Sequence, residues 1–368
     1  GLHVPEKGKT FAGEAREETV AWSKDRGRRQ GDTASELLCD RTRFKQCENW
    51  PQGPATYADS AIVMDMNSGA VLYSKQIEKK HYPASITKLL TTLVALDNAE
   101  LTDTVEFSQD SISFLEYGDA HIGMTPGEQI SMEDALYAVL LASANEVSYA
   151  VAESVGKKMG GGYDTFIQAM NDESEKLGCT GSHWTNANGL HDEQHYTTAH
   201  DMARIGAAVY QKEAFRTISQ SLSHTIPVTN LVNEERTFQQ KHKMLWPQND
   251  NYYEYCKGGK TGYTDQARTT LVTMADNGDM QLVAVVLYDF GNDAYIDTRA
   301  MFDYAYSNFS KISLKDQKLP EGVKSYEDED AYIVLPKSAQ FSDVKAEVKE
   351  DSNKDGSGTV TFTYKGQE

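Results

Sequence analysis

The sequence predicts an α+β fold, in which helices pack on an antiparallel sheet, followed by a small β domain. One strand-like hairpin covers residues 61–73, and two later β-rich runs, 269–275 and 282–288, are joined through Asn277-Gly278. An Asn-Gly pair between β-rich runs is the strongest short-range hairpin signal. Helical patterns occupy the region between the two hairpins. We therefore expect both hairpins to pair in one sheet that helices cover.

The helical regions follow from apolar periodicity. The predicted helices cover residues 85–98, 131–157, 163–177 and 199–211, and a last helix over 299–306 packs against the sheet. A small polar stretch, Ser143-Ala144-Asn145, interrupts the second of these patterns. We expect a short turn there that points at a cavity, although an ordinary polar break between helices fits equally well.

The chain of 368 residues is long enough for one large domain and one smaller domain. Residues 1–55 are polar and rich in turn residues, which predicts partial disorder or a loosely attached arm. Residues 56–310 carry the sheet and helices. Residues 311–368 hold strand-like runs at 331–335 and 359–364, which predict a small β domain with a spacer or docking role.

The bulk properties exclude several classes of function. A net charge of −19 argues against a nucleic-acid partner and against electrostatic adsorption to anionic lipid. No apolar run is long enough to span a membrane, and no signal peptide is visible, so we expect a processed chain. Cys39 and Cys47 are close enough in sequence to pair, with four free thiols as the alternative.

No metal or other cofactor is expected. Asp351, Asn353 and Asp355 resemble half of a calcium-binding loop, but Phe362 occupies the closing position. The histidines at 183, 191 and 195 lack the spacing of a zinc-binding H-E-x-x-H motif. A Ser-His-Asp hydrolase is also disfavoured, because Ser85 has no G-x-S-x-G flanks.

Ser85-Ile86-Thr87-Lys88 opens an apolar run and is the most informative stretch. On a helix, residues three apart share a face, so the lysine amine can lie beside the serine oxygen. A serine hydroxyl needs such a base, and a lysine can act as one only if its pKa is lowered by burial or by a second cation. Alone, the pattern also fits a helix start with Ser85 as N-cap.

Lys260-Thr261-Gly262 follows Gly258-Gly259 and precedes the two β-rich runs. This position predicts that the three residues lie at the start of a hairpin strand, where a glycine lets another molecule approach the backbone closely. Alone, the segment also fits a surface lysine at a strand end.

Together, S-x-x-K, S-x-N and K-T-G in this order resemble the signature of serine enzymes that recognise D-alanyl-D-alanine and penicillin. The chain is similar to the low-molecular-mass penicillin-binding proteins, and more narrowly to the D-alanyl-D-alanine carboxypeptidases, from about Ala58 to Phe309. The resemblance implies a β-lactamase/transpeptidase-like domain with an additional helical subdomain and the active site between it and the sheet. Glu146 and Arg268 depart from the family, which often has aspartate and glycine there.

The resemblance also implies roles for the motif residues. Ser85 is expected to be the nucleophile and Lys88 its base, with Ser143 relaying the proton to the departing amine. Asn145 is expected to hold the substrate's amide carbonyl. The expected substrate-binding residues on the K-T-G side are Lys260 and Thr261, which grip the terminal carboxylate, Gly262, and Tyr263, whose N–H joins that of Ser85 as oxyanion donor. Arg299 is expected either to add a second cation to the grip or to be a helix-surface arginine.

The implied function is a serine-type D-Ala-D-Ala carboxypeptidase that trims peptidoglycan stem peptides outside the cytoplasm and is inhibited by β-lactams. Full-length relatives are held to the membrane by a C-terminal segment, which this chain is expected to lack. A β-lactamase remains an alternative, with Glu128 or Glu146 as candidate deacylating bases. A penicillin-binding sensor that acylates and stalls, and an endopeptidase, also remain open.

Overall fold

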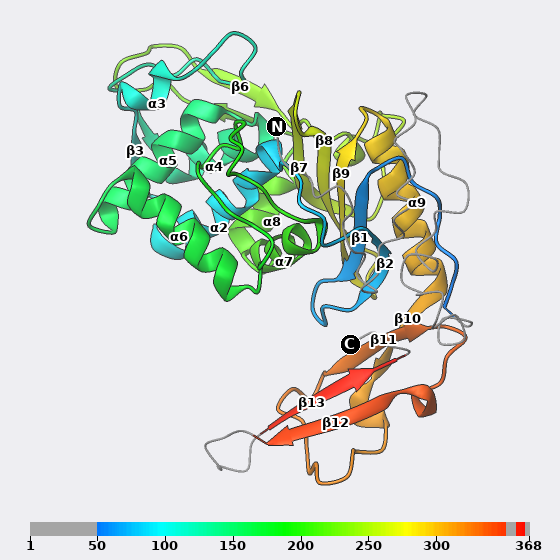
Figure 1. The fold of residues 1–368 in the computed structure, drawn as a ribbon. Coiled ribbons are helices and arrows are strands. Elements are labelled where there is room, and N and C mark those ends of the chain that lie inside the picture. The colour runs from blue at the N-terminus through cyan, green and yellow to red at the C-terminus, as the bar shows by residue number, and fades with distance from the viewer. Residues whose placement is uncertain (1–49, 351–357, 365–368) are drawn as a thin grey trace.

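The computed structural model describes residues 50–350 and 358–364 (Figure 1). The expected arm therefore lies outside the described residues except for positions 50–55, and so do the possible Cys39–Cys47 pair and the half calcium loop at 351–355. None of the helices in the described ranges combines the length and apolar character needed to cross a membrane.

The centre of the fold is a five-stranded antiparallel sheet in the order β2-β1-β9-β8-β7. Its strands are β1 (Ser60–Asp65), β2 (Val71–Lys75), β7 (Cys256–Thr264), β8 (Arg268–Asp276) and β9 (Gln281–Asp289). The Asn277-Gly278 turn joins β8 to β9, and β1 pairs with β9 through Val63 and Ala284. The prediction that the two hairpins share one sheet is confirmed.

Lys260-Thr261-Gly262 lies inside β7, and not at the start of a strand as predicted. The strand begins at Cys256, and the pairing register with β8 shifts between Cys256 and Gly259. Gly258 and Gly259 adopt φ values of +117° and +148°, which only glycine tolerates. The double glycine therefore makes a bulge within the strand, where the sequence pattern suggested a strand boundary.

Helices cover one face of this sheet (Figure 1). They are η2 (Ala84–Thr87), α2 (Lys88–Asn98), α3 (Asp110–Ser113), α4 (Met132–Leu141), α5 (Asn145–Lys158), α6 (Tyr163–Lys176), α7 (Ala199–Tyr210) and α8 (Glu213–Ser219). The short η3 (Lys243–Leu245) packs through Met244 into the core on the opposite face of the sheet. Two short hairpins lie at the outer side of this layer: β3 (Thr104–Glu106) with β4 (Gln129–Ser131), and β5 (Ser223–Ile226) with β6 (Arg236–Gln239).

Two of the predicted helices in this layer differ from the observed ones, and α3 and α8 lie outside the predicted ranges. The helix predicted from residue 85 opens with a 3₁₀ turn, so its regular α part begins at Lys88. The pattern over 131–157 forms two helices, because the chain turns at residues 142–144 and Ser143 adopts φ +56°. The interruption expected at Ser143-Ala144-Asn145 is thus a real break.

The sheet separates two hydrophobic cores because side chains alternate along its strands. Ile62 of β1 and Val285 of β9 pack with the helical layer. Val63 and Ala284 point the other way and pack with α9 (Asp293–Asn308). The helix predicted over 299–306 is part of α9 and begins earlier, at Asp293, close behind the Gly291 turn.

The C-terminal region contains two two-stranded antiparallel sheets, which agrees with the predicted β character. One pairs β10 (Phe309–Ser313) with β11 (Tyr332–Pro336), and the other pairs β12 (Lys345–Glu350) with β13 (Gly358–Thr363). Two 3₁₀ turns, η4 (Leu314–Asp316) and η5 (Phe341–Asp343), connect them. The predicted domain boundary lies at residue 310. Because β10 follows α9 with no linker between them, this boundary stays a proposal.

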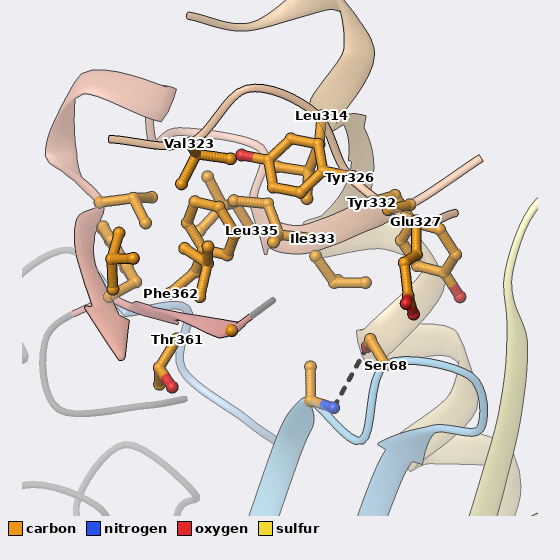
Figure 2. Close-up of a pocket in the computed structure, with 18 of the residues that line it drawn as sticks. Ser68, Leu314, Val323, Tyr326, Glu327, Tyr332, Ile333, Leu335, Thr361 and Phe362 are labelled. Carbon is orange, nitrogen blue, oxygen red and sulfur yellow. Dashed lines mark hydrogen bonds between the residues drawn. The ribbon is translucent and has the colours of Figure 1, made fainter. Parts of the chain in front are cut away.

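A cavity of about 1240 Å³ lies between the β1–β2 turn and the C-terminal strands. Figure 2 shows Tyr326, Leu335 and Phe362 gathered on one side of it, with Ser68 of the turn on the other. Trp50 also lines this cavity and packs edge-on against Phe309 with ring centroids 5.4 Å apart. In its described residues, the N-terminal segment is therefore packed against the protein and not loosely attached.

The second core predicts a large stability effect at Phe302. This ring is fully buried and stacks on Tyr253 with centroids 5.7 Å apart. Phe302→Ala is expected to lower the free energy of unfolding by about 3–5 kcal/mol, because the surroundings collapse only partly onto the lost volume. Urea unfolding followed by circular dichroism measures this. Ile296→Ala, at an exposed position of the same helix, is the control. A loss at Phe302 no larger than at Ile296 contradicts the packing.

Candidate active site

Ser85 and Lys88 lie side by side where η2 passes into α2. Lys88 Nζ is 2.8 Å from Ser85 Oγ, and the lysine side chain is fully buried. The S-x-x-K spacing therefore does bring the amine to the hydroxyl, as the sequence predicts. The tight 3₁₀ turn at Ser85 and the α-helical start at Lys88 give this contact its geometry.

Two glycines from distant segments allow the chain to pack around Ser85. A Cβ atom on Gly189 would lie 1.9 Å from the Ala84 carbonyl oxygen, and Gly189 has φ +89°. A Cβ on Gly262 would lie 2.3 Å from Thr270 Oγ1 and 3.0 Å from the Ser85 nitrogen. Ala84 itself adopts φ +56°, a strained conformation for alanine. The close approach of β7 to Ser85 thus depends on the absence of a side chain at Gly262.

Lys88 has two further hydrogen-bond partners, which come from segments distant in the sequence. Its Nζ donates to Asn145 Oδ1 at 2.8 Å and to the Asn188 carbonyl oxygen at 2.7 Å. Burial, followed by the charges of Lys260 and Lys241, holds the pKa of Lys88 well below its ordinary value. Glu146 and Asp119 act in the opposite direction but do not reverse the shift. The environment of Lys88 therefore disfavours its protonated form.

Ser143 and Asn145 lie on the turn between α4 and α5, and both are buried. Asn145 is the first residue of α5, and its backbone N–H donates to the Ala120 carbonyl oxygen at 2.9 Å. The positive φ of Ser143 reverses the chain so that Asn145 begins the next helix facing Lys88. The small polar break in the sequence was the signal for this arrangement.

Lys260, Thr261, Gly262 and Tyr263 lie on β7, the edge strand of the sheet that faces η2. Lys260 is buried, and its Nζ donates to the Thr261 carbonyl oxygen at 2.8 Å. Burial, followed by the charge of Lys241, lowers the pKa of Lys260 well below its ordinary value. Tyr263 leaves its ring exposed at the strand end. The fold therefore brings the three motifs to one place.

Comparisons with known proteins agree with this geometry. The pattern of the peptidase S11 family, described as D-alanyl-D-alanine carboxypeptidase, matches residues 47–291. The chain belongs to this family. It is 28% identical to the D-alanyl-D-alanine carboxypeptidase DacF of Bacillus subtilis over 80% of this chain and 77% of the relative. It is 32% identical to DacB2 of Mycobacterium tuberculosis over 70% of this chain and 84% of the relative.

Solved structures extend the family comparison to the fold. A D-alanyl-D-alanine carboxypeptidase from Mycobacterium tuberculosis aligns with a TM-score of 0.60 at 30% identity, covering 70% of this chain and 92% of that chain. The Streptomyces K15 DD-transpeptidase aligns with a TM-score of 0.63 at 22% identity, covering 69% of this chain and 99% of that chain, which shows the shared fold. The resemblance seen in the sequence is thereby confirmed for family and fold.

In this member of the family, Arg299 is not brought to the cluster around Ser85. It lies on α9, on the opposite face of the sheet from the helical layer. Its guanidinium donates to the carbonyl oxygens of Asn251 and Tyr252 and lies 5.2 Å from the centroid of the Tyr253 ring. These contacts fit the alternative expected for Arg299, a helix-surface arginine, better than a second cation in the carboxylate grip.

The structure adds residues that sequence reasoning missed. Lys241 follows β6, and its charge acts on both Lys88 and Lys260. Its neighbours are anchored: Gln240 donates to the Ser219 carbonyl oxygen at 3.0 Å, and His242 Nε2 is 2.9 Å from Thr273 Oγ1. No motif spacing signals Lys241, because only the anchoring of Gln240 to α8 and of His242 to β8 brings it near the site.

The histidine alternatives are accounted for by other contacts. His195 is buried, and its Nε2 lies 2.8 Å from Thr87 Oγ1, so it supports the turn behind Ser85. Burial, followed by nearby His183 and His191, lowers the pKa of His195 to about 3. The His195 imidazole is therefore neutral near neutral pH, and its role is to support the turn that carries Ser85.

The close approach of Gly189 to Ala84 predicts that Gly189→Ala slows acylation of the protein by labelled penicillin about 10²-fold, because the new methyl group displaces the Ser85 backbone. Gly278→Ala is a matched control, since Gly278 has nearly the same φ, +88°, with open space around its Cβ position. Equal acylation rates for the two variants would show that the Gly189 contact does not position Ser85.

Proposed function

We propose that the protein is a serine-type D-Ala-D-Ala carboxypeptidase in which Ser85 is the nucleophile and Lys88 its base. The observation that carries this proposal is the 2.8 Å contact between Lys88 Nζ and Ser85 Oγ inside a buried site. Membership of the peptidase S11 family supports the same reaction. The chemistry is acyl transfer through a covalent serine ester.

In the first step, neutral Lys88 accepts the proton of Ser85 Oγ as this oxygen attacks the carbonyl carbon of the penultimate D-alanine. A tetrahedral intermediate forms, and its oxyanion accepts hydrogen bonds from the backbone N–H groups of Ser85 and Tyr263. Removing one such donor typically costs roughly 3–4 kcal/mol in the barrier. The close packing of Gly262 against the Ser85 nitrogen supports this pairing of donors.

In the second step, the bond to the terminal D-alanine breaks. Ser143 relays the proton from Lys88 to the departing amine, while Asn145 holds the amide carbonyl of the substrate and keeps Lys88 in place through its 2.8 Å contact. Water then attacks the ester carbonyl and gives back the proton that Ser85 needs. The products are free D-alanine, the shortened peptide and the original enzyme.

Recognition of the free carboxylate would come from Lys260 and Thr261 on β7. In the ligand-free site, burial and Lys241 disfavour the charge of Lys260. An arriving carboxylate favours that charge again, because an opposite charge nearby stabilises the ammonium form. Lys88 has no such partner in the substrate and stays neutral. This asymmetry assigns the base to Lys88 and favours carboxypeptidase over endopeptidase action.

The substrate class follows from the family: peptidoglycan stem peptides that end in D-Ala-D-Ala, with β-lactams as inhibitors that acylate the same serine. Action on such peptides places the protein in the cell envelope, outside the cytoplasm. We propose further that residues 56–310 form the catalytic domain and that the C-terminal strands form a separate small domain. Association with the membrane is part of this proposal.

The decisive experiment compares a labelled penicillin with a peptide ending in D-Ala-D-Ala. We expect release of D-alanine together with a penicillin adduct that is lost slowly, and no adduct with Ser85→Ala, because the nucleophile is gone. Mass spectrometry of the adduct and an assay for free D-alanine measure both. Rapid penicillin turnover would indicate a β-lactamase, and a permanent adduct without peptide cleavage a sensor. Persistent labelling of Ser85→Ala would rule out the assignment.

The base role of Lys88 predicts a pH dependence that Lys241 modifies. Activity is lost as pH falls through the pKa of Lys88, since the protonated amine cannot accept the serine proton. Lys241→Met removes a cation that lowers this pKa, so the acidic limb of kcat/KM is expected to move to higher pH. Lys243→Met is the control, because its ammonium lies over the Tyr295 ring. An unmoved limb in Lys241→Met contradicts the coupling.

A further inference from the structure

Glu128 is a candidate deacylating base in the sequence analysis. In the structure its carboxylate is held by hydrogen bonds and an ion pair. Its side chain is fully buried, and Oε2 accepts from Thr125 N at 2.7 Å and Thr125 Oγ1 at 3.1 Å. Oε1 accepts from Thr229 Oγ1 at 2.6 Å, and Arg236 Nη2 lies 2.9 Å from both oxygens. Although burial raises the pKa of Glu128, hydrogen bonds from Thr229, Thr125 and Arg236 lower it overall. A carboxylate held by so many donors is a poor base for a water molecule.

These contacts join two segments that are far apart in the sequence. Thr229 and Arg236 belong to the β5–β6 hairpin and its loop, whereas Glu128 ends the segment that leads into β4. The same Arg236 Nη2 donates to the Gly123 carbonyl oxygen at 3.1 Å. Asn230 Nδ2 donates to the Gly127 carbonyl oxygen at 3.0 Å. The hairpin therefore grips residues 123–128 at several points, through backbone as well as side-chain atoms.

The other side of this segment reaches the active site. The Ala120 carbonyl oxygen accepts from the Asn145 backbone N–H at 2.9 Å. Ile122 N–H donates to Glu146 Oε2 at 3.1 Å, and Glu146 is the residue next to Asn145 in the first turn of α5. Residues 120–128 are thus held between the β5–β6 hairpin and the start of α5. Asn145 in turn places its Oδ1 2.8 Å from Lys88 Nζ.

We propose that Glu128 and Arg236 form a positioning brace that sets Asn145 against Lys88 through residues 120–128. The proposal rests on the function proposed above for Asn145 and Lys88. Neither member of the brace touches the reacting atoms, so both act as positioning residues. The buried carboxylate of Glu128 fixes the position of residues 120–128, because hydrogen bonds from both segments meet on its two oxygens. An ion pair with several donors has one well-defined geometry.

The brace predicts the effect of Glu128→Gln, which keeps the size of the side chain and removes its charge. We expect the rate of acylation by labelled penicillin, and kcat for release of D-alanine, to fall about tenfold while KM changes less than about twofold. Arg236→Lys keeps the cation but cannot span the same set of acceptors, so a smaller loss in the same direction is expected. Thermal unfolding identifies the temperature range in which each variant is folded.

His224→Gln is the matched control on the same hairpin. His224 Nε2 lies 2.7 Å from Asp134 Oδ1 and its ring stacks on Tyr137, so its polar and ring contacts among the described residues tie β5 to α4 and not to residues 120–128. Its loss weakens the attachment of the hairpin but leaves the brace in place. We expect wild-type acylation and turnover from this variant, which separates the brace from a general loosening of the hairpin.

The decisive experiment measures the effect of Glu128→Gln on acylation in a protein that also carries Asn145→Ala. If the brace acts through Asn145, Glu128→Gln adds no further loss of acylation there. An equal tenfold loss in both backgrounds, or a wild-type rate for folded Glu128→Gln, overturns the proposal. If Glu128→Gln does not fold, Arg236→Lys decides by the same comparison. Absence of acylation and of D-alanine release in the wild-type protein would instead count against the proposed function itself.

Discussion

A lysine amine beside a serine hydroxyl is the contact on which the rest of this structure depends. The protein surrounds Lys88 completely and sets other cations near it, and both effects lower its pKa. Burial in such an environment raises the free energy of an ammonium group much more than that of a neutral amine. The helical layer, the sheet and the polar contacts of Asn145 and Asn188 all serve to exclude water from this amine while leaving Ser85 open to a substrate.

The convergence of the motifs is a property of the backbone as much as of the side chains. Glycines at positions 189 and 262 let two distant segments pack directly on the turn that carries Ser85. Positive φ values at Ala84 and Ser143 show that the chain is strained on both sides of the site. Strain of this kind persists only where surrounding packing holds it, and here two separate hydrophobic cores on the faces of one sheet supply that packing.

The distribution of charge around the site distinguishes the two motif lysines, Lys88 and Lys260. The charges of Lys260 and Lys241 disfavour the protonated form of Lys88, and the charge of Lys241 disfavours that of Lys260, in a protein whose net charge is −19. In the proposed mechanism, a terminal carboxylate relieves this repulsion at Lys260 and leaves Lys88 as the group that gives up its proton. Acidic residues near the site do other work: Glu128 holds the outer segment to Arg236, and Glu146 accepts from the Ile122 backbone.

The sequence by itself determined the reaction class, the α+β fold and the pairs of residues that lie within one turn of each other. Ser85 with Lys88 and the Asn277-Gly278 hairpin are local features, for which spacing along the chain largely sets spacing in space. It also supplied Asn145 and Lys260, through the family signature and not through periodicity. The bulge at Gly258-Gly259 escaped it, because pairing with β8 decides whether a glycine pair ends a strand.

Only the tertiary structure decided which distant side chains meet. Arg299 shares a helix pattern that predicts its element, yet the face of the sheet on which α9 packs removes it from the site. Lys241 carries no motif, and its charge acts on Lys88 only because the segment after β6 is anchored to α8 and β8. Asn188 reaches Lys88 because its segment packs against the turn that carries Ser85. The physical reason is that a contact between segments a hundred or more residues apart depends on how whole layers pack. No short stretch of sequence specifies that packing.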